Sequence, residues 1–211
     1  MNSFTFIYII GIFIILNLFQ GFTNISLENQ LIYSSIFILL LGIPHGAIDH
    51  VLFFKKREMS QLKFYTIYLG LSLLFVALWH VWPITSLILF LLISAFHFGE
   101  SQFADISFKN IFRYLFYFFW GLCLLSTLMF YNVSELFEIT SYFDDTIILD
   151  KIYNKGKIGI FFYVTNIVTI ISICALVFYD KINKDRLFSE LFLLFLIHVT
   201  FYLFPFIIGF T

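Results

Sequence analysis

The sequence predicts an all-α membrane protein, a single domain over residues 1–211 built as a bundle of about seven transmembrane helices, and three observations lead to that prediction. The 211 residues are 61% hydrophobic and only 12% charged, which leaves too few polar groups to cover a water-soluble globule. Several separate stretches of about 20 residues lack interior charge, and that length is needed to cross a bilayer. Lys and Arg gather between these stretches, as in multi-pass membrane proteins.

The predicted spans follow one another along the whole chain. They cover about residues 4–19, 31–53, 64–82, 84–99, 109–131, 158–179 and 187–211. Pro83 separates the third span from the fourth, because proline cannot continue a helix without losing a backbone hydrogen bond. The first span follows no basic leader and precedes no cleavage signal, so we expect it to be retained.

The basic residues predict the orientation of the bundle. With a cytoplasmic N-terminus, nine of the 12 Lys and Arg residues lie in cytoplasmic connections and three lie in a connection on the outer side of the membrane. Basic loops stay on the cytoplasmic side, so we expect a multi-pass protein of the cell membrane in this orientation. Residues 132–157 form the one long polar connection. The net charge of −1 provides no basic field, which excludes nucleic acid as a partner.

Two polar segments interrupt the apolar background: GIPHGAIDH at residues 42–50 and SAFHFGESQ at residues 94–102. An ionisable group inside a membrane costs several kcal/mol unless it is paired, hydrated or bound to a metal. Each segment also carries glycine beside histidine, which allows close helix approach or access of a ligand to the backbone. These segments are therefore the candidate functional regions.

His45 and His97 are expected to lie at one depth on two different helices. Each is reached after a similar number of residues in a span running inwards, so at ~1.5 Å per residue both lie ~20 Å down. Neutral imidazoles that converge in this way are good ligands for iron, copper or zinc. Asp49, four residues after His45, and Glu100, after His97, are candidates to orient the two rings from the second shell.

The remaining histidines and cysteines have simpler explanations. His50 is expected at the membrane interface, and His80 in an aromatic belt. For His198, both a local hydrogen bond and a position lining a cavity remain open. Cys123 and Cys174 lie in apolar stretches and are expected to be small buried hydrophobic side chains without a disulfide. A lone histidine near a helix end is also more often packed than bound to a metal, so the residues alone leave that alternative open for His45 and His97.

The two histidine segments together resemble the Brp/Blh family, the bacterial and archaeal membrane β-carotene 15,15′-dioxygenases. The resemblance extends from about residue 35 to the end, including FPFIIGFT at residues 204–211. It implies cleavage of the central double bond of β-carotene by O₂ at non-haem Fe(II), giving two molecules of retinal. On that resemblance His45 and His97 are iron ligands, within an apolar tunnel open to the lipid bilayer.

The family completes its iron centre with two more histidines, spaced four apart on a later helix. This sequence stops at Thr211, before that motif, so the resemblance implies a chain that lacks the last motif-bearing helix. We expect such a chain to bind iron weakly and to turn over poorly.

Three other classes of function remain as alternatives. A non-catalytic carotenoid- or retinal-binding protein, or an inactive homologue, would tolerate an incomplete ligand set, although an opsin would need a lysine in the last span. A different metalloenzyme, such as a desaturase, would need several His-x-x-His boxes, and the sequence has none. A purely structural bundle would contain no metal after purification.

Overall fold

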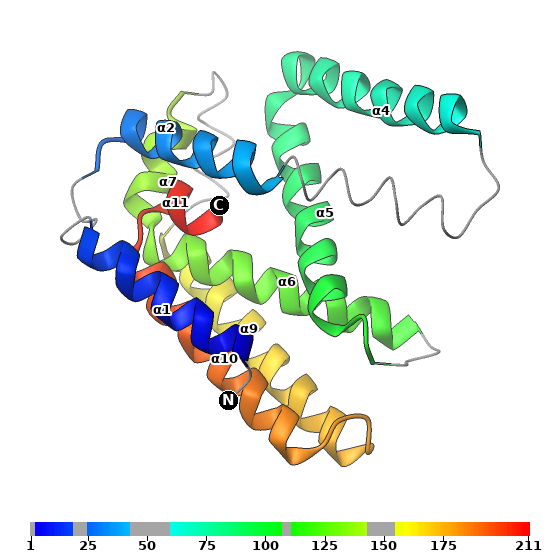
Figure 1. Cartoon of the computed structure of the whole chain (residues 1–211), viewed down its shortest axis with the longest axis vertical. Helices are drawn as coiled ribbons and strands as arrows, with labels where there is room; N and C mark the ends of the chain where they lie inside the picture. The colour runs from blue at the N-terminus through cyan, green and yellow to red at the C-terminus, as the bar shows by residue number, and fades with distance from the viewer. Residues whose placement is uncertain (1–2, 19–24, 43–59, 107–110, 143–154) are drawn as a thin grey trace.

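The structure is a computed structural model that describes residues 3–18, 25–42, 60–106, 111–142 and 155–211. Every regular element within those residues is helical (Figure 1), which confirms the predicted all-α class for them. In chain order the elements are α1 (Ser3–Leu18), α2 (Leu27–Phe37) with a short π-helical extension η1 (Ile38–Gly42), α4 (Gln61–Val81), α5 (Pro83–Phe103), α6 (Ile111–Tyr131), α7 (Val133–Thr140), α9 (Lys155–Phe178), α10 (Lys184–Leu203) and α11 (Phe206–Phe210).

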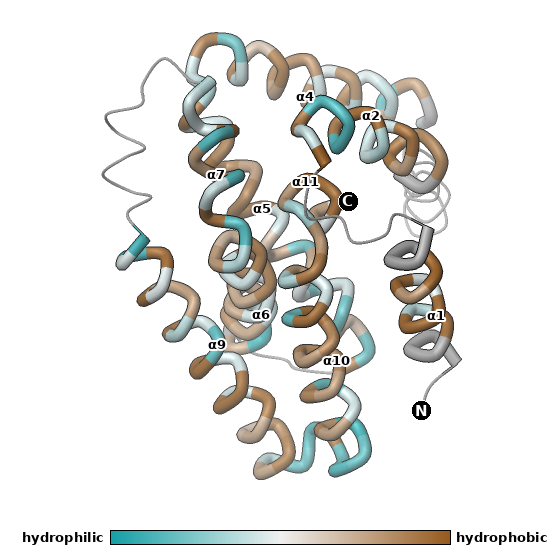
Figure 2. Tube along the Cα trace, turned by 90° about the vertical axis from the view of Figure 1, so that its left-hand side faces the viewer, coloured by the Kyte–Doolittle hydropathy of each residue, from teal (hydrophilic) through white to brown (hydrophobic). Residues whose placement is uncertain are grey.

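Five of the described helices are long and apolar enough to cross a membrane, namely α4, α5, α6, α9 and α10. They match the third to seventh predicted spans. The first predicted span forms α1, which has 16 residues, and the second is described only as far as Gly42. Figure 2 shows apolar residues along most of the helical surface and hydrophilic residues at the turn between α9 and α10. Several spans are thus supported, whereas the count of seven is not confirmed.

The break predicted at Pro83 is present. Helix α4 ends at Val81 and α5 begins at Pro83, with Trp82 in a non-helical conformation between them. Proline suits the first position of a helix because its missing N–H would have had no partner there. The two helices meet at a steep angle in Figure 1, and no residue of α4 whose exposure the structure describes is buried.

Helix α6 is the centre of the described bundle and packs against α5, α9 and α10. Polar side chains lie at its contact with α9, within the membrane-length part of both helices. The Ser126 and Thr165 hydroxyls lie 2.6 Å apart, and Asn166 Nδ2 donates to Thr127 Oγ1 at 3.3 Å. In a membrane, helices gain little from hydrophobic burial against each other, so small residues and such hydrogen bonds hold them together.

The seventh predicted span, 187–211, extends too far. Helix α10 ends at Leu203, because Pro205 has no N–H to donate to the carbonyl of Phe201, four residues earlier. That carbonyl instead accepts a hydrogen bond from Nδ2 of Asn132 at 3.1 Å. Asn132 follows α6 directly, so a side chain from another helix satisfies the oxygen freed by proline.

After Pro205 the chain forms α11, which packs against α2. The N–H of Phe206 donates to the Glu135 carboxylate of α7 at 2.7 Å, and the N–H of Ile207 donates to Oε1 of Gln30 at 3.3 Å. Gln30 Nε2 in turn donates to Glu135 at 3.3 Å. The C-terminal segment therefore lies beside α2, early in the chain, with its first backbone N–H groups satisfied (Figure 1).

Candidate functional site

His97 lies in the second half of α5, six residues before the helix ends at Phe103. It is exposed, as is Glu100, three residues further on. Residues three apart in a helix share a face, so both side chains project from the same side of α5. The imidazole lies 6.3 Å from the Phe98 ring, measured between centroids.

The opposite side of α5 is in contact with α6. A Cβ built at Gly99 would overlap the carbonyl oxygen of Tyr117, and a Cβ at Gly121 would overlap the carbonyl oxygen of Ala95. Both glycines thus let the two backbones approach more closely than any side chain would permit. Of the two purposes expected for glycine beside histidine, close helix approach is the one that Gly99 serves. Because Gly99 faces α6, His97 is turned away from it.

A polar cluster fastens the end of α5 to the start of α10. Gln102 Nε2 donates to both carboxylate oxygens of Glu190, at 2.9 and 3.2 Å. Arg186 pairs with Glu190 at 2.6 Å and donates to the backbone carbonyl of Gln102 at 3.2 Å. Asp105 adds a longer contact to Arg186, at 3.6 Å.

Glu190 is the most enclosed member of this cluster, with 3% of its side chain exposed against 35% for Arg186. A buried carboxylate is costly unless charges and hydrogen bonds compensate for the lost water, and here a guanidinium and an amide do so. The cluster consequently fixes the last turn of α5, the helix that carries His97.

Replacing Glu190 with leucine is expected to lower the free energy of unfolding by about 1–3 kcal/mol, because Gln102 and Arg186 lose a charged acceptor inside the protein. Thermal unfolding of the purified protein in detergent would measure the loss. Glu138→Leu is the matched control, since Glu138 is exposed on α7. Equal melting temperatures for the two variants would contradict a stabilising cluster.

An apolar cavity of about 550 Å³ adjoins the turn of α5 that carries His97. Phe98 contributes to its wall, and the other lining residues come from α1, α2, α6, α10 and α11. Two of the polar groups on the wall, the Tyr8 and Thr200 hydroxyls, bond to each other at 2.9 Å. Phe210 of α11 packs against Phe98 with ring centroids 6.3 Å apart. The cavity suits a long apolar ligand, because pockets of about 300–1,000 Å³ lined by aromatic side chains are typical small-molecule sites.

The structure tests the predicted site only in part. His45, Asp49 and His50 lie outside the described residues, so the convergence of His45 with His97 stays a prediction. In the part of the chain that is described, no three His, Cys, Asp or Glu side chains group closely enough to hold a metal ion. His97 is therefore a single candidate ligand, and a complete metal site would need residues beyond those described.

The structure describes the remaining histidines and both cysteines considered in the sequence analysis. His80 is exposed near the end of α4. His198 makes the local hydrogen bond considered for it, from Nδ1 to the Leu194 carbonyl at 2.8 Å, and it also lines a pocket. Both cysteines are free; Cys123 is buried as expected, whereas Cys174 is exposed on α9.

Sequence reasoning missed the cluster around Glu190. The signal was present, because Glu190 stands inside an apolar stretch with Arg186 one helical turn earlier. In the sequence, Arg186 is only one of the nine basic residues of the predicted cytoplasmic connections. Gln102 lies inside the second polar segment, and nothing in the sequence around it indicates a hydrogen bond to Glu190, 88 residues later.

An all-helical fold with several membrane-length helices, and an apolar cavity beside a histidine-bearing turn, defines a membrane protein suited to a hydrophobic ligand. The family model described as beta-carotene 15,15'-dioxygenase matches residues 36–211, and the chain belongs to that family. The curated beta-carotene 15,15'-dioxygenase of the uncultured marine bacterium 66A03 is 38% identical to it over 71 residues. That alignment covers 31% of this chain and 26% of the relative. No solved structure matches the chain significantly.

Proposed function

We propose that this chain acts in the oxidative cleavage of β-carotene, in which O₂ adds one oxygen atom to each carbon of the central double bond and two molecules of retinal form. The support is family membership together with one structural observation. That observation is the apolar cavity whose wall includes Phe98, next to His97. A polyene held there would lie against the turn that carries the candidate ligand.

The proposed cofactor is Fe(II), which when bound supplies the activation of O₂. His45 and His97 would be its ligands from this chain, with Asp49 and Glu100 orienting the rings. Two imidazoles hold ferrous iron weakly against water, so further ligands are needed for a stable centre. Of these candidate residues the structure describes His97 and Glu100, and the packing of Gly99 on α6 turns the His97 side chain away from α6.

The cavity would position the substrate and exclude water. Its aromatic walls offer ring faces on which a flat conjugated chain can stack. Its lining includes side chains from α1 and α2 and from α10 and α11, so the polyene would lie between helices from the early and the late part of the sequence. Because β-carotene is insoluble in water, we propose entry from the lipid bilayer.

Retinal formation in β-carotene-producing cells tests this proposal. We expect retinal to form in cells that express this protein, and at least about hundredfold less of it after His45→Ala, because loss of an imidazole ligand lowers the affinity of the site for iron. Retinal would be measured by chromatography with mass detection. Equal yields from the parent and the variant would contradict the ligand assignment. Carotenoid that co-purifies without any retinal would instead favour a non-catalytic binding protein.

We further propose a multi-pass location in the cell membrane with a cytoplasmic N-terminus. The contact between Asp105 and Arg186 supports it, because it brings the basic connections after α5 and after α9 to one end of the bundle. Alkaline phosphatase fused after Lys184 is expected to be inactive, and after Lys155 active. The reverse pattern would contradict this orientation.

A further inference from the structure

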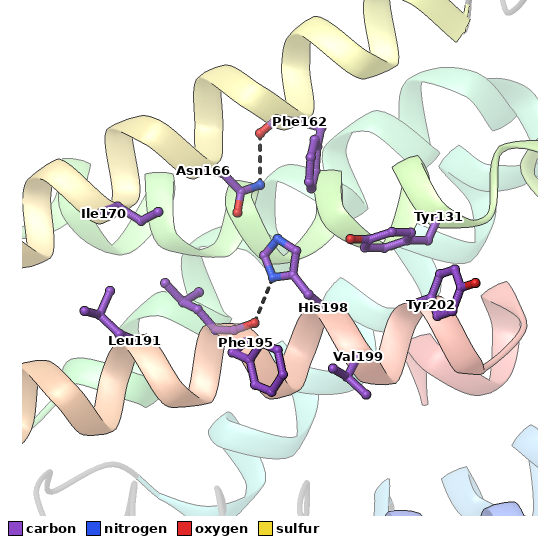
Figure 3. Close-up of a pocket in the computed structure, with 10 residues that line it drawn as sticks. Tyr131, Phe162, Asn166, Ile170, Leu191, Phe195, His198, Val199 and Tyr202 are labelled. Atoms are coloured by element: carbon purple, nitrogen blue, oxygen red, sulfur yellow. Dashed lines mark hydrogen bonds between the residues drawn. The ribbon is translucent and has the colours of Figure 1, made fainter.

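A second pocket, of about 560 Å³, lies between α9 and α10 beside the end of α6 (Figure 3). It shares no lining residue with the cavity next to His97 and lies on another side of α10. Its wall is mainly aliphatic and aromatic, with Asn166, His198 and two tyrosines as its polar residues. Phe195 and Ile170 on its wall are 60% and 42% exposed, so the pocket opens on the outer surface of two membrane-length helices.

The hydrogen bond of His198 determines what its ring offers to this pocket. Nδ1 lies 2.8 Å from the carbonyl oxygen of Leu194, and a carbonyl oxygen can only accept. Nδ1 therefore carries the proton, and Nε2 of the neutral ring presents a lone pair. No described residue donates a hydrogen bond to Nε2. The imidazole thus presents an acceptor to the pocket.

Asn166, like His198, has no N–H left to donate to a ligand in this pocket. Its Nδ2 donates to the carbonyl of Phe162 at 2.9 Å and to Thr127 Oγ1 at 3.3 Å, which uses both amide hydrogens. Its Oδ1 accepts from Cys123 Sγ at 3.3 Å and keeps a second lone pair. The carbonyl of Phe162 fixes this orientation of the amide, because the opposite orientation would bring two oxygens together.

Among the described residues that line this pocket, Tyr131 supplies the hydroxyl that faces His198. Its ring lies 6.1 Å from the imidazole, edge to face, and Figure 3 shows its oxygen directed towards His198. A ligand hydroxyl between them would donate to Nε2 and accept from the tyrosine O–H. An ether or carbonyl oxygen would only accept, which would leave the imidazole acceptor unsatisfied.

We propose that this pocket binds the hydroxyl end of a lipid-soluble alcohol, a long hydrocarbon that enters from the bilayer. The aliphatic and aromatic wall contacts the hydrocarbon, and His198 with Tyr131 recognises the hydroxyl. Specificity for a donor follows because a site built to bond a hydroxyl rejects analogues that leave its polar groups unpaired.

The test uses the purified chain in phosphatidylcholine nanodiscs and a hexadecanol carrying a photoreactive diazirine. Mass spectrometry of the labelled peptides is expected to locate the label on α9, α10 or the end of α6, the helices that line the pocket. Unlabelled hexadecanol is expected to compete about tenfold better than hexadecyl methyl ether or hexadecanal, which corresponds to one hydrogen bond. This comparison needs no variant, so it does not depend on how a substitution folds.

Two substitutions identify the residues that recognise the hydroxyl. His198→Phe keeps an aromatic ring but removes Nε2, and should weaken competition by hexadecanol about tenfold while leaving the ether unchanged. Tyr131→Phe should weaken both, because both ligands accept from its hydroxyl. His80→Phe, on α4, is the control and should change neither. Equal competition by alcohol and ether would overturn the proposal, as would a label outside α9, α10 and the end of α6. Competition by hexadecanol that is unchanged in His198→Phe would also overturn it.

Discussion

His97→Ala is expected to reduce retinal formation, the activity proposed for this protein, at least about hundredfold. Loss of a residue that only orients a metal ligand typically costs about 10–100-fold, and loss of the ligand itself should cost more. His97 is exposed on α5, on the side away from α6, so alanine removes the imidazole without opening a hole in the packed interface. Retinal would be measured in β-carotene-producing cells that express either the parent protein or the variant.

Two further measurements separate loss of a ligand from loss of the fold. The iron content of the purified His97→Ala protein should fall together with retinal, while its melting temperature stays near that of the parent. His80→Ala is the matched control, because His80 is also exposed, on the neighbouring helix α4. Unchanged iron content and retinal yield in His97→Ala would exclude this residue from the iron site.

Gly99→Ala is expected to lower the free energy of unfolding by about 3 kcal/mol, the upper end of what overpacking usually costs. The added methyl would overlap the backbone carbonyl of Tyr117, which cannot rotate away as a flexible side chain can. Relief requires α5 and α6 to separate along their whole crossing, where Gly121 meets Ala95 in the same way. The melting temperature in detergent should fall by about 6–12 °C.

Gly70→Ala and Gly159→Ala are the controls for this prediction. Both glycines lie inside helices, and a Cβ at either one would meet nothing within 4 Å. Alanine favours helix over glycine by about 0.8–1.0 kcal/mol, so these variants should be as stable as the parent or slightly more stable. If Gly99→Ala had the same melting temperature as these two controls, the close crossing of α5 and α6 would be contradicted.

The same substitution should affect function through the direction of His97. A shifted α5 would turn the imidazole and move Phe98, which lines the apolar cavity. Retinal formation should therefore fall in Gly99→Ala even below its melting temperature. Gly70→Ala provides the comparison, since it leaves the crossing of α5 and α6 intact.

Pro83 and Pro205 show how much of the fold a sequence pattern can predict. Pro83 stands between two apolar stretches that are each long enough to span, so the break there could be predicted, and α4 and α5 divide at that point. Pro205 stands inside one apolar stretch, which hides the end of α10 at Leu203. The break is stabilised by Asn132 on a distant part of the chain, and no local pattern around Pro205 reveals that contact.

By itself, the amino-acid sequence determined the helical class, the membrane-length apolar stretches and the family, because these depend on composition, on runs of apolar residues and on short motifs. The tertiary structure alone decided that Gly99 faces α6, that Glu190 secures the end of α5, and that separate cavities flank α10. Each of these depends on which helix faces which. Side-chain packing and hydrogen bonds between residues far apart in sequence settle that choice, and in a uniformly apolar chain the hydrophobic pattern carries little information about it.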